Sequence, residues 1–457
     1  MKRFLSAQDA AEFIEQHAVA ARPAESQVPP AQRQEKRMEE TRALFKALGS
    51  PQFSVPVAHI TGTSGKGSAS VFLAAILQAQ GLRVCLYTNP YIICPQERIQ
   101  IDGRYISDEL FIELAEKLAD VLERFREEHP TFIPHIKQLW TAMAFLAAEA
   151  VKADIFVAEV GMGGRFDETN VAQPQVCVIT TIGFDHMEFL GADLAHIAWH
   201  KAGIIKRGIP VVTGANDSSA LAVIKQEAET QAAPLLEMNS DFGASEICAT
   251  AGETTFTYTD YTARYERLRL RLTGAFQARN AALAICAAKA ARPEISEDAI
   301  RTGLLAAWLP GRFEIVRRNP YVILDAAHNP EKMRACLETL RLTIHPQKTI
   351  IIFGALGSKA ILQMLEECAA LNPLIIAAEP KVTGRISAPA NQISAAAAQL
   401  GLRHIIAGNA EDAVRIALEN AAEADAVLIT GSLFLVSNLR AYVLQTVMQN
   451  AIDRHDP

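Results

Sequence analysis

Gly62-Thr63-Ser64-Gly65-Lys66-Gly67-Ser68 is the stretch that decides the fold of this chain. It lies between a short apolar run, Val55–Ile60, and a stretch of helical composition, Ala69–Ala79. A strand, a glycine-rich loop and a helix in this order form the unit of a phosphate-binding α/β domain. The glycines let backbone N–H groups close around phosphate oxygens, while the lysine and the helix N-terminus supply positive charge. The stretch therefore predicts a nucleotide phosphate site rather than a plain turn.

This loop departs from the usual spacing of a P-loop, because Gly67 and not Ser or Thr follows the lysine. The hydroxyl group that faces a metal ion must then come from Ser68 or from elsewhere in the chain. A GTPase switch is disfavoured, since the sequence contains no Asn-Lys-x-Asp motif for reading guanine.

The rest of the chain predicts two α/β domains. Before the loop we expect helices at 7–20 and 33–48, and after it strands at 83–87, 155–158 and 176–182. Residues 254–259 and 267–272 alternate apolar with polar, which is typical of an antiparallel appendage on the first domain. From about residue 321 onward, strands and helices alternate in a second series. This pattern predicts strands at 321–324, 349–353, 374–378, 404–406 and 426–430, and helices at 331–342, 359–371, 391–400, 411–421 and 435–449.

The expected fold is thus an N-terminal, P-loop-type, doubly wound sheet with a small antiparallel appendage, followed by a smaller C-terminal Rossmann-like α/β domain. The length of 457 residues is too great for one ordinary core. We place the domains at residues 1–310 and 311–457, with the boundary near Leu309-Pro310-Gly311.

Composition narrows the class of protein. Half of the residues are hydrophobic, 21% are charged and the net charge is −7, without a basic stripe for a nucleic acid backbone. The seven cysteines are scattered and form no C-x-x-C pair, which argues against a disulfide framework or a zinc site. Neither a signal peptide nor an apolar run long enough for a bilayer is apparent. We expect a cytoplasmic protein that binds neither nucleic acid nor membrane.

Polar residues follow several of the predicted strands. Glu159 ends the strand at 155–158 and His186 follows the strand at 176–182, where a magnesium ligand is expected in a nucleotide site. Taken singly, Glu159 is also compatible with a charge in a loop, and a lone histidine such as His186 is more often structural than a metal ligand. The segment Lys201–Lys206 and the turn Asp325–Pro330 are similarly undecided when each is considered alone.

Together these segments resemble the folylpolyglutamate synthase and dihydrofolate synthase family, within the wider Mur-type ligases. The resemblance runs from about Arg37 to Leu439. It includes Leu48-Gly49-Ser50-Pro51, the glycine loop, Glu97-Arg98-Ile99, Glu159–Asn170, Gly183–His186, Lys201–Lys206, Gln277 with Asn280, Leu309–Phe313, Asp325–Pro330 and Gly431-Ser432-Leu433.

The resemblance implies a ligase that uses ATP and Mg²⁺, with one or two metal ions. Lys66 and the backbone of Gly62–Ser68 would hold the ATP phosphates, and the residues that contact ATP would also include Asn280, Arg312, Asp325 and His328. The metal ligands would be Asn89, Glu159 and His186, together with Lys201 in a carbamylated form. The catalytic residues would be Lys66, Lys201, His186, Asp325 and His328.

The implied reaction turns a carboxylate into an acyl phosphate, which an amine then attacks. Both steps gather negative charge on oxygen atoms, so fixed cations are the main catalytic device. The leading substrates are a folate and L-glutamate, as in folate biosynthesis and one-carbon metabolism. Dihydropteroate with glutamate, alone or as a second activity, is the alternative, and a monomer is expected.

Two departures from the family pattern keep other functions open. Where the family usually has Ser-Pro-His, with the serine on magnesium, this chain has Asn89-Pro90-Tyr91 after Thr88. Where it often has Phe-Glu, this chain has Lys137-Gln138. A related ligase acting on a non-folate carboxylate is therefore a further hypothesis, and a nucleotide-binding protein without catalysis is another.

Overall fold

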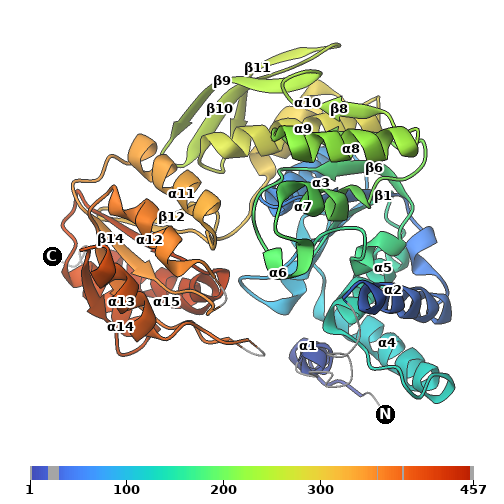
Figure 1. Cartoon of the computed structure of the whole chain (residues 1–457), viewed down its shortest axis with the longest axis horizontal. Coiled ribbons are helices and arrows are strands. Elements are labelled where there is room, and N and C mark those ends of the chain that lie inside the picture. The colour runs from blue at the N-terminus through green and yellow to red at the C-terminus, as the bar shows by residue number, and fades with distance from the viewer. Residues whose placement is uncertain (1–2, 19–29, 358, 383–384, 453–457) are drawn as a thin grey trace. The chain divides into compact units, whose positions relative to one another are not determined.

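The computed structural model describes residues 3–18, 30–357, 359–382 and 385–452, which form two compact units (Figure 1). One unit runs up to Ser245 and includes Thr257–Leu268 and Arg279–Ala307, and the other consists of Glu246–Phe256, Arg269–Ala278 and the chain from Trp308 onward. The last residues of the helix expected at 7–20 lie outside the described residues.

The first unit is built on an eight-stranded sheet with the order β4-β3-β2-β5-β1-β6-β7-β8. Strands β2, β5, β1, β6, β7 and β8 are parallel, and β3 and β4 extend the sheet as antiparallel strands. This confirms the predicted doubly wound sheet. The strands are β1 (Val57–Thr61), β2 (Val84–Tyr87), β3 (Ile99–Ile101), β4 (Arg104–Tyr105), β5 (Ile155–Glu159), β6 (Pro174–Ile179), β7 (Val211–Thr213) and β8 (Leu235–Glu237).

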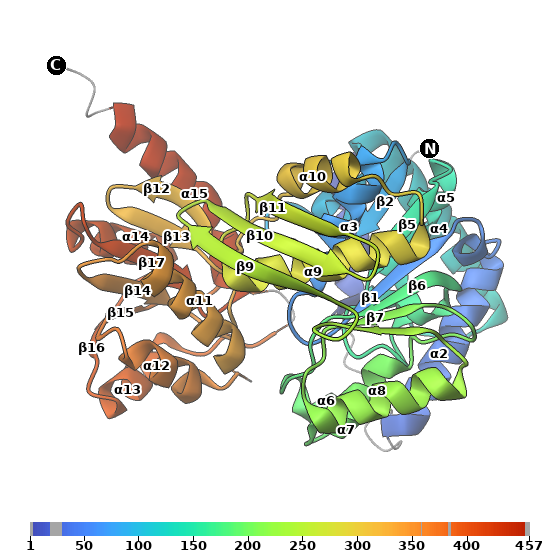
Figure 2. The ribbon, with the colours of Figure 1, turned by 90° about the horizontal axis from the view of Figure 1, so that it is seen from above.

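Helices cover both faces of this sheet. Helix α3 packs on β1, β2 and β5, and α10 packs on α3, while α7 and α8 pack together on the opposite face (Figure 2). The helices are α1 (Ala7–Glu15), α2 (Pro30–Ala47), α3 (Lys66–Ala79), α4 (Asp108–Glu128), α5 (Ile136–Ala150), α6 (Met187–Leu190), α7 (Leu194–Ala202), α8 (Ser218–Thr230), α9 (Ala275–Ala291) and α10 (Glu297–Ala306), with single turns η1 (Gln16–Ala18), η3 (Pro51–Phe53), η4 (Pro95–Arg98) and η5 (Glu168–Val171).

Three element boundaries differ from the predictions for physical reasons. The helix expected at 33–48 begins at Pro30, because proline suits the first helical position. The helix expected at 69–79 begins at Lys66, directly after Gly65 in the left-handed conformation. The strand expected at 176–182 ends at Ile179, because Thr180 and Thr181 turn to bind the loop that follows β1.

The second unit contains a six-stranded sheet with the order β12-β13-β17-β14-β15-β16, parallel except for β12. Helices α11, α12 and α13 cover one face and α14 and α15 the other (Figure 2). The strands are β12 (Glu314–Arg318), β13 (Tyr321–Leu324), β14 (Thr349–Phe353), β15 (Leu374–Ala377), β16 (Arg403–Ile406) and β17 (Ala426–Thr430), and the helices are α11 (Pro330–Thr343), α12 (Ile361–Ala369), α13 (Ala390–Gln399), α14 (Ala410–Glu419) and α15 (Leu433–Ile452).

All ten elements predicted for this second sheet are present within three residues of their expected ends. Strand β12 was not predicted. Its sequence, Glu-Ile-Val-Arg-Arg, carries charges at both ends, and it lies at the edge of the sheet, where one side needs no partner strand.

A separate three-stranded sheet, β11-β10-β9, is formed by β9 (Phe242–Thr250), β10 (Glu253–Asp260) and β11 (Arg264–Leu270). The connections between successive strands are too short for a parallel crossover, so the sheet is an antiparallel meander, as predicted for 254–273. Its residues are divided between the two compact units. Strand β9 was missed, because its small and polar residues follow no clear alternation.

Two features bear on the class of protein. All seven cysteines are free, and five are buried as small apolar residues, as expected. Within the described parts of the chain, no helix combines the length and the apolar character that crossing a bilayer requires.

Gly303 sets the close packing of α10 on α3. A Cβ atom at this position would lie 2.5 Å from Cα of Ile76 and 2.6 Å from the carbonyl oxygen of Ala75, both backbone atoms of α3. We expect Gly303→Ala to lower the free energy of unfolding by about 1–3 kcal/mol, because α10 must move away from α3. Chemical denaturation measures this, with Thr302→Ala, exposed on the same helix, as the control. Equal stability of Gly303→Ala and wild type would show that the helices adjust freely.

Candidate active site

The predicted phosphate loop connects β1 to α3. Strand β1 ends at Thr61 and α3 begins at Lys66, so the first turn of α3 points its N–H groups into the loop. Gly65 has φ +86°, and a Cβ atom there would overlap with the side chain of Asn280. Glycine is therefore required at this position for both conformation and space. The predicted nucleotide residue Asn280, on α9, lies directly against the loop.

Threonines that follow β6 hold the loop in place. The Thr63 N–H donates to the Thr181 carbonyl oxygen at 2.7 Å, and the Ser64 N–H donates to Thr181 Oγ1 at 3.1 Å. Thr180 Oγ1 donates to the Ser64 carbonyl oxygen at 2.6 Å. Hydrogen bonds within the protein thus fix the conformation of the loop. Sequence reasoning missed both threonines as site residues, although a Thr-Thr pair at the end of a buried strand was the available signal.

Two of the predicted catalytic lysines meet at one backbone atom. Lys66 Nζ donates to the carbonyl oxygen of Gly62 at 3.0 Å, and Lys201 Nζ donates to the same oxygen at 2.8 Å. Lys201 lies near the end of α7 and is only 3% exposed. The structure therefore places two ammonium groups at the start of the phosphate loop, where they would attract a polyanion.

Glu159 ends β5 beside β1, since it pairs with Ile60 in the parallel ladder. Its carboxylate is buried, and Oε2 accepts a hydrogen bond from the N–H of Asn89 at 3.1 Å. The structure brings these two predicted metal ligands together. The side-chain oxygen of Asn89, however, accepts hydrogen bonds from the Tyr87 hydroxyl and from Arg98. Arg98 is a further residue for which the sequence predicted no role.

His186 lies at the end of the loop that follows β6, in the left-handed conformation. Gly183, in the same loop, exchanges two hydrogen bonds of 3.0 Å with Thr63, one through its N–H and one through its carbonyl oxygen. The loop that carries His186 is therefore attached to the phosphate loop. Nε2 of His186 lies 3.9 Å from Asp185 Oδ1.

The donor atoms here suit Mg²⁺ bound together with a nucleotide. Within the described ranges, no three His, Cys, Asp or Glu side chains gather into a metal cage. Mg²⁺ usually takes one or two carboxylates and completes its shell with phosphate and water oxygens. The buried Glu159 carboxylate beside the phosphate loop fits this requirement without a cage.

The predicted residues of the second unit cluster at the carboxyl end of β13. Asp325 accepts hydrogen bonds of 2.8 Å from the backbone N–H groups of Phe313 and Ala327. Burial raises the pKa of the Asp325 carboxyl group, although the Arg312 guanidinium and these N–H groups oppose the shift. His328 lies on the same loop, with Nδ1 2.9 Å from the Ala326 carbonyl oxygen. The structure thus joins Arg312, Asp325 and His328 in one loop cluster.

Comparisons with known proteins agree with this architecture. Residues 60–288 match the Mur ligase middle domain, and residues 311–433 match the glutamate ligase domain of Mur ligases. The dihydrofolate synthase/folylpolyglutamate synthase of Bacillus subtilis (strain 168) is 36% identical over 412 residues, which cover 87% of this chain and 93% of that protein. The folylpolyglutamate synthase of Lacticaseibacillus casei is 34% identical over 408 residues, covering 88% and 93%.

Solved structures of folylpolyglutamate synthases are also similar to this chain. The Mycobacterium tuberculosis folylpolyglutamate synthase complexed with ADP has a TM-score of 0.86 at 29% identity, covering 95% of this chain and 98% of that chain. A folylpolyglutamate synthase complex with AMPPCP and folate has a TM-score of 0.82 at 30% identity, covering 96% and 100%. This chain therefore belongs to the Mur ligase family and, within it, to the folylpolyglutamate synthase and dihydrofolate synthase group.

Proposed function

We propose that this protein is an ATP-dependent ligase that adds L-glutamate to a folate through an acyl phosphate. The observation that carries the proposal is the pair of ammonium groups, Lys66 and Lys201, on the Gly62 carbonyl oxygen at the mouth of a preorganised phosphate loop. The solved relative that holds AMPPCP and folate supports the choice of substrates.

The reaction follows from the chemistry of these groups. The folate carboxylate attacks the γ-phosphorus of ATP, the bond to the β-phosphate breaks, and ADP leaves with the electron pair. The glutamate amine then attacks the acyl carbon, loses a proton, and releases inorganic phosphate. Lys66, Lys201 and the N–H groups at the start of α3 stabilise the negative charge that grows on the phosphate oxygens. Arg312, Asp325 and His328 complete the nucleotide contacts in this proposal.

A metal ion is part of the proposal. Glu159 and His186 would hold Mg²⁺, which when bound neutralises charge on the phosphates. Asn89 would join them only after its side-chain oxygen leaves Arg98 and Tyr87, and the buried Thr88 hydroxyl is the alternative donor. Carbamylation of Lys201 would replace its ammonium group by an anionic carbamate, which would keep one N–H for the Gly62 carbonyl oxygen and would offer two oxygen atoms to a second metal ion. In that form the positive charge next to the phosphates would come from the second ion and from Lys66.

Dihydrofolate synthase activity is a second candidate function. The Bacillus subtilis and Mycobacterium tuberculosis relatives, at 36% and 35% identity, both carry the name dihydrofolate synthase/folylpolyglutamate synthase. We also propose that the protein acts as a cytoplasmic monomer, with its domain boundary at residues 310 and 311, next to the start of the glutamate ligase match.

Release of ADP in the presence of different acids distinguishes these functions. With ATP, Mg²⁺ and L-glutamate, we expect turnover with tetrahydrofolate, and with dihydropteroate if the enzyme is bifunctional. Unrelated carboxylic acids should leave the rate at background. Turnover with an unrelated acid alone would identify a non-folate ligase, and nucleotide binding without turnover with any acid would identify a catalytically silent protein.

Replacement of Lys66 tests the phosphate loop. We expect Lys66→Ala to lower kcat by at least about 100-fold, because a fixed cation at the transferred phosphoryl group is lost. Lys46→Ala, an exposed position on α2, is the matched control and should keep wild-type turnover. Full activity of Lys66→Ala would contradict the assignment of Gly62–Ser68 as the phosphate site.

A further inference from the structure

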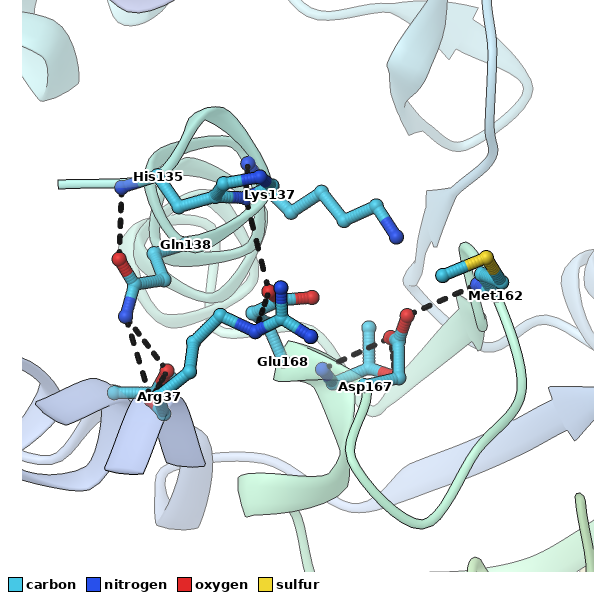
Figure 3. Close-up of polar contacts among 9 residues, drawn as sticks. Arg37, His135, Lys137, Gln138, Met162, Asp167 and Glu168 are labelled. Atoms are coloured by element: carbon cyan, nitrogen blue, oxygen red, sulfur yellow. Dashed lines mark hydrogen bonds and ion pairs between the residues drawn. The ribbon is translucent and has the colours of Figure 1, made fainter. Parts of the chain in front are cut away.

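A cluster of charged side chains in the first unit is not used by the reaction described above (Figure 3). It joins the start of α5, which supplies Lys137, to Arg37 of α2 and to Glu168 at the start of η5. Asp167 precedes η5 and lies on the same side as Met162 (Figure 3). Met162, Asp167 and Glu168 follow Glu159 closely along the chain.

The start of α5 is locked in position. The His135 N–H donates to Gln138 Oε1 at 2.8 Å, and Gln138 Nε2 donates to Thr41 Oγ1 of α2 at 3.0 Å. Gln138 is completely buried. Lys137, between these two anchored residues, therefore projects from a rigid part of the backbone.

Glu168 is a buried carboxylate with incomplete hydrogen bonding. Its side chain is 1% exposed, and Oε1 lies 3.3 Å from Arg37 Nε and 3.8 Å from His135 Nδ1. Among the described residues, neither Glu168 Oε1 nor Arg37 Nε has a hydrogen-bond partner of good geometry. A buried ion pair is costly unless further hydrogen bonds satisfy it. Because both atoms are enclosed by the protein, a ligand would interact with this pair through its charge and not by direct contact.

Lys137 supplies a positively charged ammonium group on the same side of the cluster as Gly161. Its ammonium lies beside Gly161, two residues after Glu159: a Cβ atom built on Gly161 would be 3.8 Å from Lys137 Nζ and 3.3 Å from Asp167 Oδ2. Figure 3 shows the Lys137 side chain directed away from Arg37, toward the side of Met162 and Asp167. No hydrogen bond or ion pair joins this ammonium to any described residue.

Asp167 does not take up this positive charge. Its Oδ2 accepts from the Met162 N–H at 3.0 Å, and its Oδ1 accepts from the N–H and hydroxyl of Thr169. Both oxygens therefore hold the loop together. Among the described residues the Lys137 ammonium remains a donor without a hydrogen-bond acceptor, beside Gly161, which follows Glu159 by two positions.

We propose that Lys137 is a specificity-determining residue, whose ammonium donates a hydrogen bond to an oxygen atom of the acid substrate. The inference rests on the proposed ligase function and names a contact for its acceptor. An acid with an oxygen atom that accepts from the Lys137 ammonium fits this site, next to the buried negative charge of Glu168. A simple dicarboxylate such as glutamate fits less well, because Glu168 would repel it.

The test compares Lys137→Met, which keeps the length of the side chain but not its charge, with Lys137→Arg. We expect Lys137→Met to raise KM for the acid by about 10- to 100-fold, because a hydrogen bond from a charged donor is lost. KM for ATP and for glutamate should stay at the wild-type value, and Lys137→Arg should recover most of the loss. The control is Lys117→Met, a half-exposed lysine that pairs with Glu149 on the surface.

Three results would overturn the inference. One is an unchanged KM for the acid in Lys137→Met, and another is an increase in KM for glutamate or ATP instead. The third is a Lys137→Met/Glu168→Gln double variant with wild-type kinetics, since Lys137 would then only offset the charge of Glu168. A wild-type enzyme that turns over no folate would defeat the proposed function, and the same KM comparison would then be made with the acid that it does use.

Discussion

The Gly62 carbonyl oxygen accepts hydrogen bonds from two lysine ammonium groups, and the phosphate site is organised around this shared contact. Two like charges on one acceptor repel each other, and their repulsion is strongest where water is excluded. Lys201 is buried, so little solvent screens it. The two ammonium groups therefore favour the binding of the phosphates of a nucleotide at the start of the loop.

The parallel sheet explains how these groups come together. Register pairs Ile60 of β1 with Glu159 of β5 and Thr61 with Ile179 of β6. The carboxyl ends of the three strands consequently lie at one edge, where ligands bind in open α/β sheets. The phosphate loop, the Glu159 carboxylate and the threonines after β6 all leave the sheet from this edge. Hydrogen bonds between these segments then fix their positions more closely than the strands alone do.

Charges near the site are mostly paired within the protein. Arg98 donates a hydrogen bond to the side-chain oxygen of Asn89, and two backbone N–H groups donate hydrogen bonds to the carboxylate of Asp325. Such pairing holds polar side chains in defined orientations at the cost of removing them from water. Lys137 differs from this pattern among the described residues, because its neighbour Asp167 is fully engaged by the backbone and by Thr169. The Lys137 ammonium opposes the rise that burial causes in the pKa of Glu168, but it acts through charge alone, so its hydrogen bonds stay available for a ligand.

Local patterns in the sequence predicted four of the eight strands of the first sheet and the second sheet almost element by element, because buried parallel strands are continuous apolar runs between glycine-rich turns. The strands β3, β4, β7 and β8 were not predicted, since each has only two or three residues. The phosphate loop and Glu159 were also predictable, since each lies directly after a predicted strand. The tertiary structure alone decided that Lys201, 139 positions from Gly62, reaches its carbonyl oxygen. It also decided that Arg98 donates a hydrogen bond to the side chain of Asn89 and that Arg37 forms an ion pair with Glu168. These contacts join segments far apart in the chain, and their distances depend on how helices pack on the sheet, which no local sequence pattern encodes.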